Sequence, residues 1–361
     1  MAGMNRNKFN GRPEIKTVNV GGLYIGGDHT ISVQSMTNTD TRDAKKTLQQ
    51  IYRLEKAGCE LVRVAVPDSD TINSLAKICK KSNIPIMADI HFSHKLALKS
   101  VESGVDGLRI NPGNIGGKRK IKEVVESCKN NNVPIRIGVN SGSLEEDLAE
   151  KFDGPTPEAM AASAERHVRY LEKLNFSDII VSLKSTSVVD TIEANKLFAR
   201  KFSYPLHIGI TEAGAGRRGV IKSAAGLGAL IIQGLGDTVR VSLTGDPVRE
   251  VETAYQILNS LEVRRRGMQI ISCPTCGRTE IDIEKIVESL EKELEDLPSH
   301  LTIAVMGCEV NGPGEASHAD IGLAGGKGNG LIFKQGEVVK KVKEEEMVDA
   351  LLEEIKQMEC E

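Results

Sequence analysis

The stretch VPIRIGV, at residues 133–139, has the composition of a buried β-strand. It is short and rich in valine and isoleucine, and an asparagine that favours a turn follows it. Seven other stretches share these features, at residues 30–36, 61–66, 84–90, 106–110, 178–183, 205–211 and 238–243. Amphipathic helical patterns alternate with them; one places Ile121, Val124, Val125 and Cys128 on a single face.

Eight strand–helix units over roughly 240 residues are typical of a TIM (β/α)8 barrel. A doubly wound open sheet is the alternative, although eight regular units favour closure. Before the first unit, Gly21 and Gly22 separate two alternating segments, which predicts an N-terminal hairpin. The regular pattern ends at the basic run 264–266, so we expect a barrel with its hairpin at residues 1–266.

The remaining residues, 267–361, have the pattern of a small α+β domain. We expect a strand at 268–272, a helix at 282–297, a strand at 301–306, a glycine-rich loop, a hairpin at 331–342 and a helix at 345–358.

Composition excludes several classes of protein. The net charge of −3 and the 3% of aromatic residues, with no Trp, disfavour a nucleic-acid-binding surface. No apolar run reaches the roughly 20 residues that span a bilayer. The N-terminus lacks the apolar core of a signal peptide, so we expect a cytoplasmic protein. In that setting seven cysteines indicate metal or redox chemistry rather than disulfides.

Basic residues recur in the predicted barrel strands, which are normally buried on both faces. They are Arg63, Arg109, Arg136, Lys184 and Arg240. Asp89 and Glu212 neutralise only part of this charge if the barrel closes. An anionic ligand with several charges is the natural partner, because arginine side chains suit phosphate oxygens. The alternative is an internal network of arginines and carboxylates that only stabilises the barrel.

Polar residues at the same level of the barrel are candidates to orient such a ligand. They are His91, Asn111, Asn140, His207 and Ser242. For each of the two histidines a structural role is an equal alternative.

Three cysteines follow strand-like runs in the second domain: Cys273 and Cys276 as a Cys-x-x-Cys pair, and Cys308. Three thiolates suit zinc or an iron–sulfur cluster. A structural zinc site needs a fourth ligand. The glycine-rich loop after Cys308, which carries the oxygen ligand Glu315, favours a cluster. We assign no metal to Cys59, Cys79, Cys128 or Cys360.

Several motifs together resemble the 4-hydroxy-3-methylbut-2-enyl diphosphate synthase family. They are VQSMTNTDT (33–41), MADIHF (87–92), LRINPGN (108–114), RIGVNSGSL (136–144), VSLKST (181–186), HIGITEAG (207–214), VRVSLTGDP (239–247), SCPTCGRTE (272–280) and MGCEVNGPGEA (306–316). The resemblance is to the short bacterial form. It implies a TIM barrel and a small domain similar to those of sulfite and nitrite reductases, in a head-to-tail homodimer.

The resemblance also implies a cofactor and an activity. A 4Fe-4S cluster would be held by Cys273, Cys276, Cys308 and Glu315. The reaction would be the reductive dehydration of 2-C-methyl-D-erythritol 2,4-cyclodiphosphate in isoprenoid biosynthesis by the methylerythritol phosphate route. Flavodoxin or ferredoxin would be the electron donor.

For this reaction we expect a division of labour among the residues. The five basic residues and Ser242 would hold the diphosphate, with Asn140 orienting it. Glu212 would donate a proton to the leaving oxygen, and Glu315 would give way to substrate at the cluster. Asp89 and His91 would contact substrate hydroxyl groups or support the barrel mouth.

Two other classes remain as alternatives. A radical-type iron–sulfur barrel enzyme normally carries its three cysteines near the first barrel loop, unlike this chain. A zinc-ribbon binding module would require a second Cys-x-x-Cys pair.

Overall fold

The computed structural model describes residues 14–294, 300–308, 316 and 318–360. The chain divides into two compact units, residues 1–264 and 265–361, and each is described by itself. No described helix combines the length and the apolar character that crossing a membrane requires.

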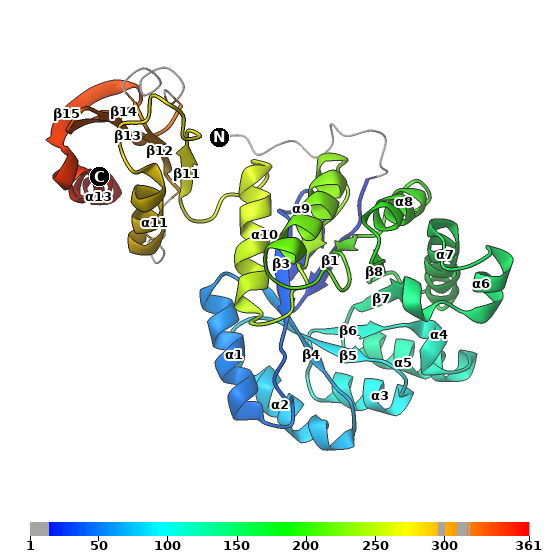
Figure 1. Ribbon diagram of the computed structural model, residues 1–361. Coiled ribbons are helices and arrows are strands. Elements are labelled where there is room, and N and C mark those ends of the chain that lie inside the picture. The colour runs from blue at the N-terminus through cyan, green and yellow to red at the C-terminus, as the bar shows by residue number, and fades with distance from the viewer. Residues whose placement is uncertain (1–13, 295–299, 309–315, 317, 361) are drawn as a thin grey trace. The chain divides into compact units, whose positions relative to one another are not determined.

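Eight parallel strands form the barrel of the first unit (Figure 1). They are β3 (Ser32–Met36), β4 (Leu61–Ala65), β5 (Ile86–Ile90), β6 (Gly107–Ile110), β7 (Ile135–Asn140), β8 (Ile179–Lys184), β9 (His207–Ile208) and β10 (Thr238–Val239). Their order is β8-β7-β6-β5-β4-β3-β10-β9, and a parallel bridge between Val181 and Leu206 joins the two ends. The predicted TIM barrel is confirmed, and the open sheet is excluded.

Helices surround the strands and bury their apolar faces against them. The main ones are α1 (Ala44–Lys56), α2 (Ile72–Lys81), α3 (His94–Glu102), α5 (Lys118–Asn130), α7 (Pro157–Lys173), α8 (Val188–Ala199), α9 (Gly216–Ile232) and α10 (Val248–Ser260). Two shorter helices, α4 (Pro112–Ile115) and α6 (Glu146–Lys151), lie in the loops after β6 and β7. Side-chain caps at Asp43, Ser93, Thr156 and Ser187 satisfy first-turn amides, which fixes where these helices begin.

The strands β9 and β10 are shorter than the predicted segments 205–211 and 238–243. Beyond them, single hydrogen bonds continue the pairing: Arg240 N donates to Ile208 O at 3.0 Å and Thr211 N to Ser185 O at 3.3 Å. The backbone therefore stays paired at the barrel mouth but no longer forms a regular ladder there.

The predicted hairpin is present as β1 (Thr17–Val20) and β2 (Leu23–Gly26). Its two turn glycines have φ of 59° and 94°, which side chains other than glycine rarely adopt. The hairpin packs Val18, Val20 and Ile25 against Leu61, Met87 and Ile180, which lie at or near the starts of barrel strands. It covers the end of the barrel opposite to the strand termini where TIM-barrel sites form.

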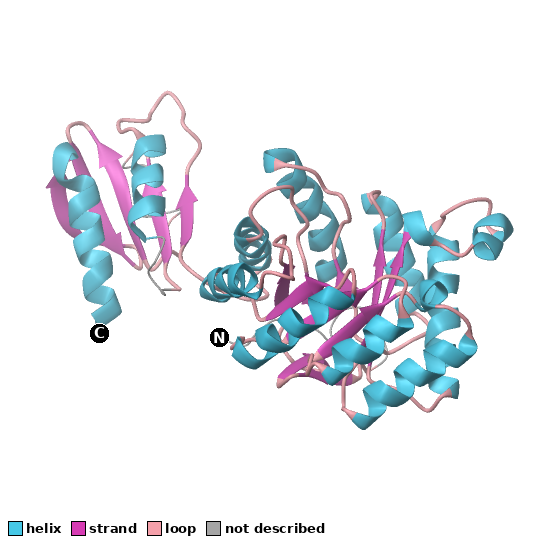
Figure 2. Ribbon diagram, turned by 90° about the horizontal axis from the view of Figure 1, so that it is seen from below, coloured by secondary structure: helices cyan, strands magenta, loops and turns pink. Residues whose placement is uncertain are grey.

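The second unit is a five-stranded sheet with two helices that lie side by side on one face (Figure 2). The strands are β11 (Gln269–Ser272), β12 (Thr302–Met306), β13 (Ile321–Gly326), β14 (Asn329–Lys334) and β15 (Glu337–Lys343), and the helices are α11 (Ile283–Leu294) and α13 (Met347–Cys360). The first three strands run parallel, and the last three form an antiparallel meander.

One prediction for this unit was wrong. The segment that forms β13 was expected to be part of the glycine-rich loop. Its sequence, IGLAGG, has glycines where strands usually carry side chains. A Cβ on Gly322 would lie 2.3 Å from the Phe333 ring, and one on Gly325 2.7 Å from Ile281. These glycines make room for large neighbours in a buried strand.

Candidate active site

The five predicted basic residues lie on the barrel strands or directly after one of them, and Arg109, Arg136 and Lys184 are buried. Arg63 lies on β4, Arg109 on β6, Arg136 on β7 and Lys184 on β8. Arg240 directly follows β10. Arg136 is only 1% exposed. Each of these charges needs a hydrogen-bonding or ionic partner, because an unpaired buried ion costs several kcal/mol.

Asp89, at the end of β5, is the partner of two of these arginines. Its Oδ1 accepts from Arg109 Nη1 at 3.0 Å, and its Oδ2 lies 3.5 Å from Arg63 Nε. His91 Nε2 lies 3.7 Å from the same oxygen. Burial raises the pKa of Asp89, but Arg63, His91 and Arg109 outweigh it and hold that pKa well below its usual range. Asp89 is therefore ionised and acts as a structural counter-ion.

Glu250, on α10, is a second buried carboxylate that pairs with one of the five basic residues. It receives two hydrogen bonds of 3.2 Å from Arg240, one of 2.8 Å from Ser35 and one of 3.0 Å from the Leu243 amide. The sequence analysis missed it and named Glu212 as a counter-ion instead. Glu212 is exposed and has a left-handed φ of 51°, so it does not compensate the buried charge. The sequence signal for Glu250 is its position on the face of α10 that is directed toward the strands.

Arg136 has a neutral partner. Its Nη1 donates to Gln34 Oε1 at 2.5 Å, and Gln34 in turn donates to Thr238 at 2.7 Å. Within the described part of the chain, its Nη2 is buried and lacks a hydrogen-bond partner. Burial and the neighbouring Arg63 and Arg109 lower the pKa of Arg136 well below its usual value. The free Nη2 is therefore a donor that an anion can satisfy.

Met36 and two glycines shape the space around the cations. Arg63 donates from Nε and Nη2 to Met36 Sδ at 3.1 and 2.9 Å. A Cβ on Gly138 would lie 2.4 Å from Arg109 Nε, and one on Gly209 2.7 Å from Lys184 Nζ. Sequence reasoning missed these residues. The sequence signal for Gly138 and Gly209 is their spacing. Gly138 lies two residues after Arg136 and Gly209 two residues after His207, so each glycine shares a strand face with that residue.

Lys184 contacts a histidine rather than a carboxylate. Its Nζ lies 2.9 Å from His207 Nε2, and both side chains are buried. The expected ligand-facing His207 thus lies within the basic cluster.

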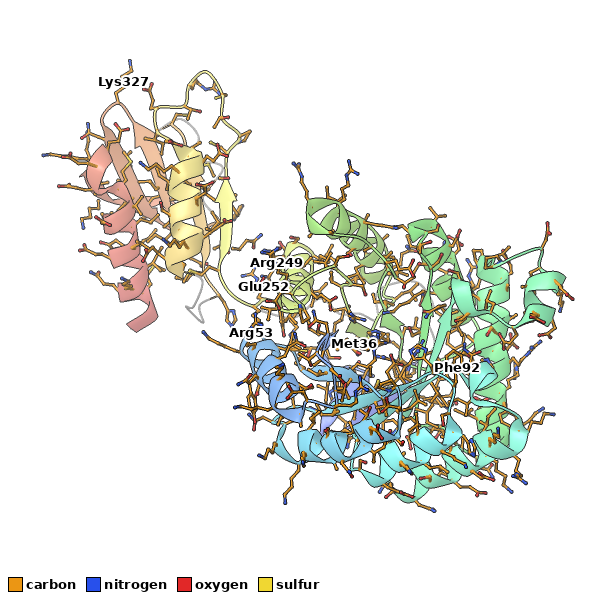
Figure 3. All side chains as sticks on the ribbon, turned by 60° about the horizontal axis from the view of Figure 1, so that its bottom comes forward. Met36, Arg53, Phe92, Arg249, Glu252 and Lys327 are labelled. Atoms are coloured by element: carbon orange, nitrogen blue, oxygen red, sulfur yellow. The ribbon has the colours of Figure 1, made fainter. Side chains whose placement is uncertain are left out.

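The other predicted residues are more scattered. Asn111 is buried and caps α4 by accepting from the Gly113 amide at 3.1 Å. Asn140 ends β7 and Ser242 lies three residues beyond β10, and both are half-buried. His91 is exposed, next to Phe92, which is 72% exposed (Figure 3).

The cluster as a whole carries more positive than negative charge. Among the described residues, five basic side chains face Asp89 and Glu250, an excess of three positive charges when all are ionised. Burial, together with the neighbouring Arg240 and Arg109, lowers the pKa of Arg63 to about 10. The arrangement can bind a compact polyanion whose oxygens accept from guanidinium groups.

The second unit holds the predicted cysteines. Cys273 directly follows β11, and the Gly307 amide, beyond the end of β12, donates to its Sγ at 3.2 Å. Cys308 is the next residue along and is buried, whereas Cys276 is exposed. A backbone hydrogen bond from Arg278 lowers the pKa of Cys276, which favours the thiolate form that metals bind. Glu315 lies outside the described residues, and those that are described contain no preformed group of three or more metal-ligating side chains.

Three of the unassigned cysteines belong to the barrel and its helices. Burial raises the pKa of Cys59, Cys79 and Cys128 to about 12, so each remains a neutral thiol. The side chain of Cys360 is outside the described set.

Gly138→Ala tests the space reserved for Arg109. The added methyl group would displace the guanidinium, and we expect affinity for pyrophosphate to fall about tenfold, or about 1.4 kcal/mol, with little change in folding. Isothermal titration calorimetry measures the affinity. Gly228→Ala on α9 is the matched control, because a Cβ there meets nothing within 4 Å. Equal affinities in both variants would contradict the assignment.

Glu250→Gln tests the counter-ion role of Glu250. It leaves Arg240 without a carboxylate, so we expect the free energy of unfolding to fall by about 3–5 kcal/mol. Pyrophosphate should restore part of that loss, because the anion supplies the missing negative charge. Urea unfolding with and without pyrophosphate measures both effects. Glu123→Gln, at an exposed ion pair on α5, should change stability by less than about 1 kcal/mol.

Comparison with known proteins covers both units. The family model described as the GcpE TIM-barrel domain matches residues 15–255, and the GcpE protein C-terminal domain matches residues 269–357. A solved structure of 3-dehydroquinate dehydratase from Geobacillus kaustophilus HTA426 covers 68% of this chain and 97% of its own, with a TM-score of 0.50 and 17% identity. That likeness shows the barrel fold alone.

Curated relatives match nearly the whole chain. The 4-hydroxy-3-methylbut-2-en-1-yl diphosphate synthase (flavodoxin) of Clostridium acetobutylicum is 55% identical over 347 residues, 96% of this chain and 99% of the relative. The enzyme of the same name from Thermodesulfovibrio yellowstonii is 54% identical over 345 residues, with the same coverage. The chain belongs to the GcpE family.

Proposed function

We propose that this protein catalyses the reductive ring opening and dehydration of 2-C-methyl-D-erythritol 2,4-cyclodiphosphate to 4-hydroxy-3-methylbut-2-enyl diphosphate, a step in isoprenoid precursor biosynthesis. Relatives about 55% identical carry the name of that product's synthase. The observation that carries the proposal is the uncompensated basic cluster in the barrel, whose charge suits a diphosphate.

The basic residues would bind the substrate and stabilise the leaving diphosphate. Arg136 Nη2 offers a buried donor with no partner among the described residues. Arg63, Arg109 and Arg240 are already oriented by Asp89 and Glu250, so little reorganisation is needed when negative charge develops on the diphosphate. Asn111, Asn140, Ser242 and His91, at or near the ends of their strands, are proposed to orient the substrate's remaining oxygens.

The cysteine site fits the proposed 4Fe-4S cluster. Cys273 and Cys308 follow the paired strands β11 and β12, which places two thiols at one edge of the sheet. Cys276 and Glu315 would complete the ligand set, with Glu315 the ligand that gives way to substrate. When bound, the cluster supplies the two electrons of the reaction. Because the relatives' names specify flavodoxin, we propose flavodoxin as the donor. The proposed assembly is the head-to-tail homodimer that the resemblance implies.

Glu212 is the proposed proton donor for the oxygen that leaves as water. It follows the strand segment that carries His207, and it is exposed. Its exposed position leaves the carboxyl group accessible to a bound substrate.

The direct test is turnover by protein that has been purified and reconstituted without oxygen. We expect a brown protein with about four irons per chain that converts the cyclodiphosphate when a chemical reductant is present. Cys273→Ser should lose colour and turnover but retain binding of pyrophosphate to the barrel. A colourless protein with one zinc per chain, or a cluster-loaded protein without turnover, would contradict the proposal.

Glu212→Gln separates proton donation from binding. We expect the variant to bind the cyclodiphosphate with unchanged affinity and to lose turnover by about 100-fold or more, the range of general acid catalysis. Single-turnover measurements with the reduced protein give the rate, and calorimetry gives the affinity. Retained turnover would remove Glu212 from the acid role.

A further inference from the structure

Lys184 differs from the other basic residues of the barrel in its partner. The four arginines contact Asp89, Glu250, Gln34 or Met36, whereas Lys184 Nζ contacts His207 Nε2 at 2.9 Å. Both side chains are buried, and His207 is fully so. The nearest charges on the surrounding elements are those of Arg63, Arg109, Arg136 and Arg240. The two carboxylates of the cluster are engaged by arginines.

The contact restricts where protons reside. Two basic nitrogens at 2.9 Å share one proton in their hydrogen bond, so one of them must offer a lone pair. A protonated His207 would direct one N–H at the lysine and the other into a buried space, because Nδ1 has no partner within the described structure. Burial, Lys184 and Arg136 lower the pKa of His207 well below its usual value. His207 is therefore neutral.

The charge balance then acts on Lys184. Guanidinium groups keep their protons under ordinary conditions, whereas a buried ammonium releases its proton readily. Loss of one proton from Lys184 reduces the positive excess of the cluster from three to two. Burial and the neighbouring Arg240 and Arg136 lower the pKa of Lys184 well below its usual value, which agrees with this direction.

We propose that Lys184 is an uncharged amine in the free barrel, hydrogen-bonded to neutral His207, and takes up one proton when a diphosphate dianion binds. The identity of the anion rests on the proposed function. The ammonium is thus formed only when there is negative charge for it to meet. Ring opening adds a third ionisable oxygen to the diphosphate, and the excess of three positive charges that the cluster has with Lys184 protonated matches the three negative charges of the opened diphosphate.

Proton uptake is measured by titration calorimetry in buffers with different ionisation enthalpies. The ligand is the cyclodiphosphate, and the protein is purified without oxygen and left unreduced so that no turnover occurs. Each phosphorus of this ligand keeps one strongly acidic oxygen, so the ligand itself does not titrate near neutral pH. At about pH 8, well below the usual lysine pKa, we expect uptake of close to one proton per ligand bound.

The pH dependence has a definite sign. Binding raises a pKa that is low in the free protein, so uptake is large between the free and bound values. It should decline as the pH falls through the free-state pKa, because Lys184 is then already charged. Uptake that grows toward acid pH would contradict the proposal.

Variants assign the proton to Lys184. Lys184→Arg fixes the charge and Lys184→Met removes it, so both should bind without proton uptake, Lys184→Met more weakly. His94→Gln, at a half-buried site on α3 outside the basic cluster, is the control and should retain uptake. Uptake that persists in Lys184→Met would overturn the assignment.

If the variants fold poorly, titration of the wild-type protein in different buffers still tests the proposal. Clear binding with no buffer dependence would overturn the proposal and leave the proposed function intact, whereas no binding of the cyclodiphosphate would contradict the proposed function itself. Nitrogen-15 NMR of histidine-labelled protein gives a second readout: His207 should show the neutral pattern at pH 6 and pH 8, with and without ligand. A protonated His207 in either state would contradict the pairing.

Discussion

The interior of the barrel holds more buried positive charge than its carboxylates balance. Asp89 and Glu250 are the only carboxylates that pair with the five basic residues in the described part of the chain, and each is bonded to arginine. A barrel that only needed stability would gain from apolar side chains in these positions. This excess of positive charge supports the proposal that the cluster binds an anion.

Neutral groups set the geometry of this cluster. Gln34 holds Arg136 and His207 contacts Lys184, so these two cations are oriented without a carboxylate, and Met36 is a neutral contact of Arg63 in addition to Asp89. Gly138 and Gly209 leave the room that the long side chains occupy. Orientation without neutralisation preserves the attraction for a diphosphate and removes the cost of rearranging the site when it binds.

Much of this arrangement follows from the sequence, for a physical reason. Short apolar runs that alternate with helical patterns predict eight buried strands. A basic residue within such a run, such as Arg63 or Arg136, is expected to point into the barrel. Glu250 escaped prediction because it lies on a helix, where an acidic residue is ordinarily solvent-exposed. Strand β13 was not predicted because its glycines are typical of a loop. The structure shows that Phe333 and Ile281 fill the space beside them. Contacts between distant segments decide both cases.

A crystal structure of the protein with bound cyclodiphosphate tests the central claim most directly. The account predicts that the diphosphate lies inside the barrel and that one of its oxygens accepts a hydrogen bond from Arg136 Nη2, the buried donor without a partner in the described structure. Lys184 Nζ should lie within hydrogen-bond distance of a second phosphate oxygen. A diphosphate bound elsewhere, with Arg136 Nη2 still unpaired, would contradict the account.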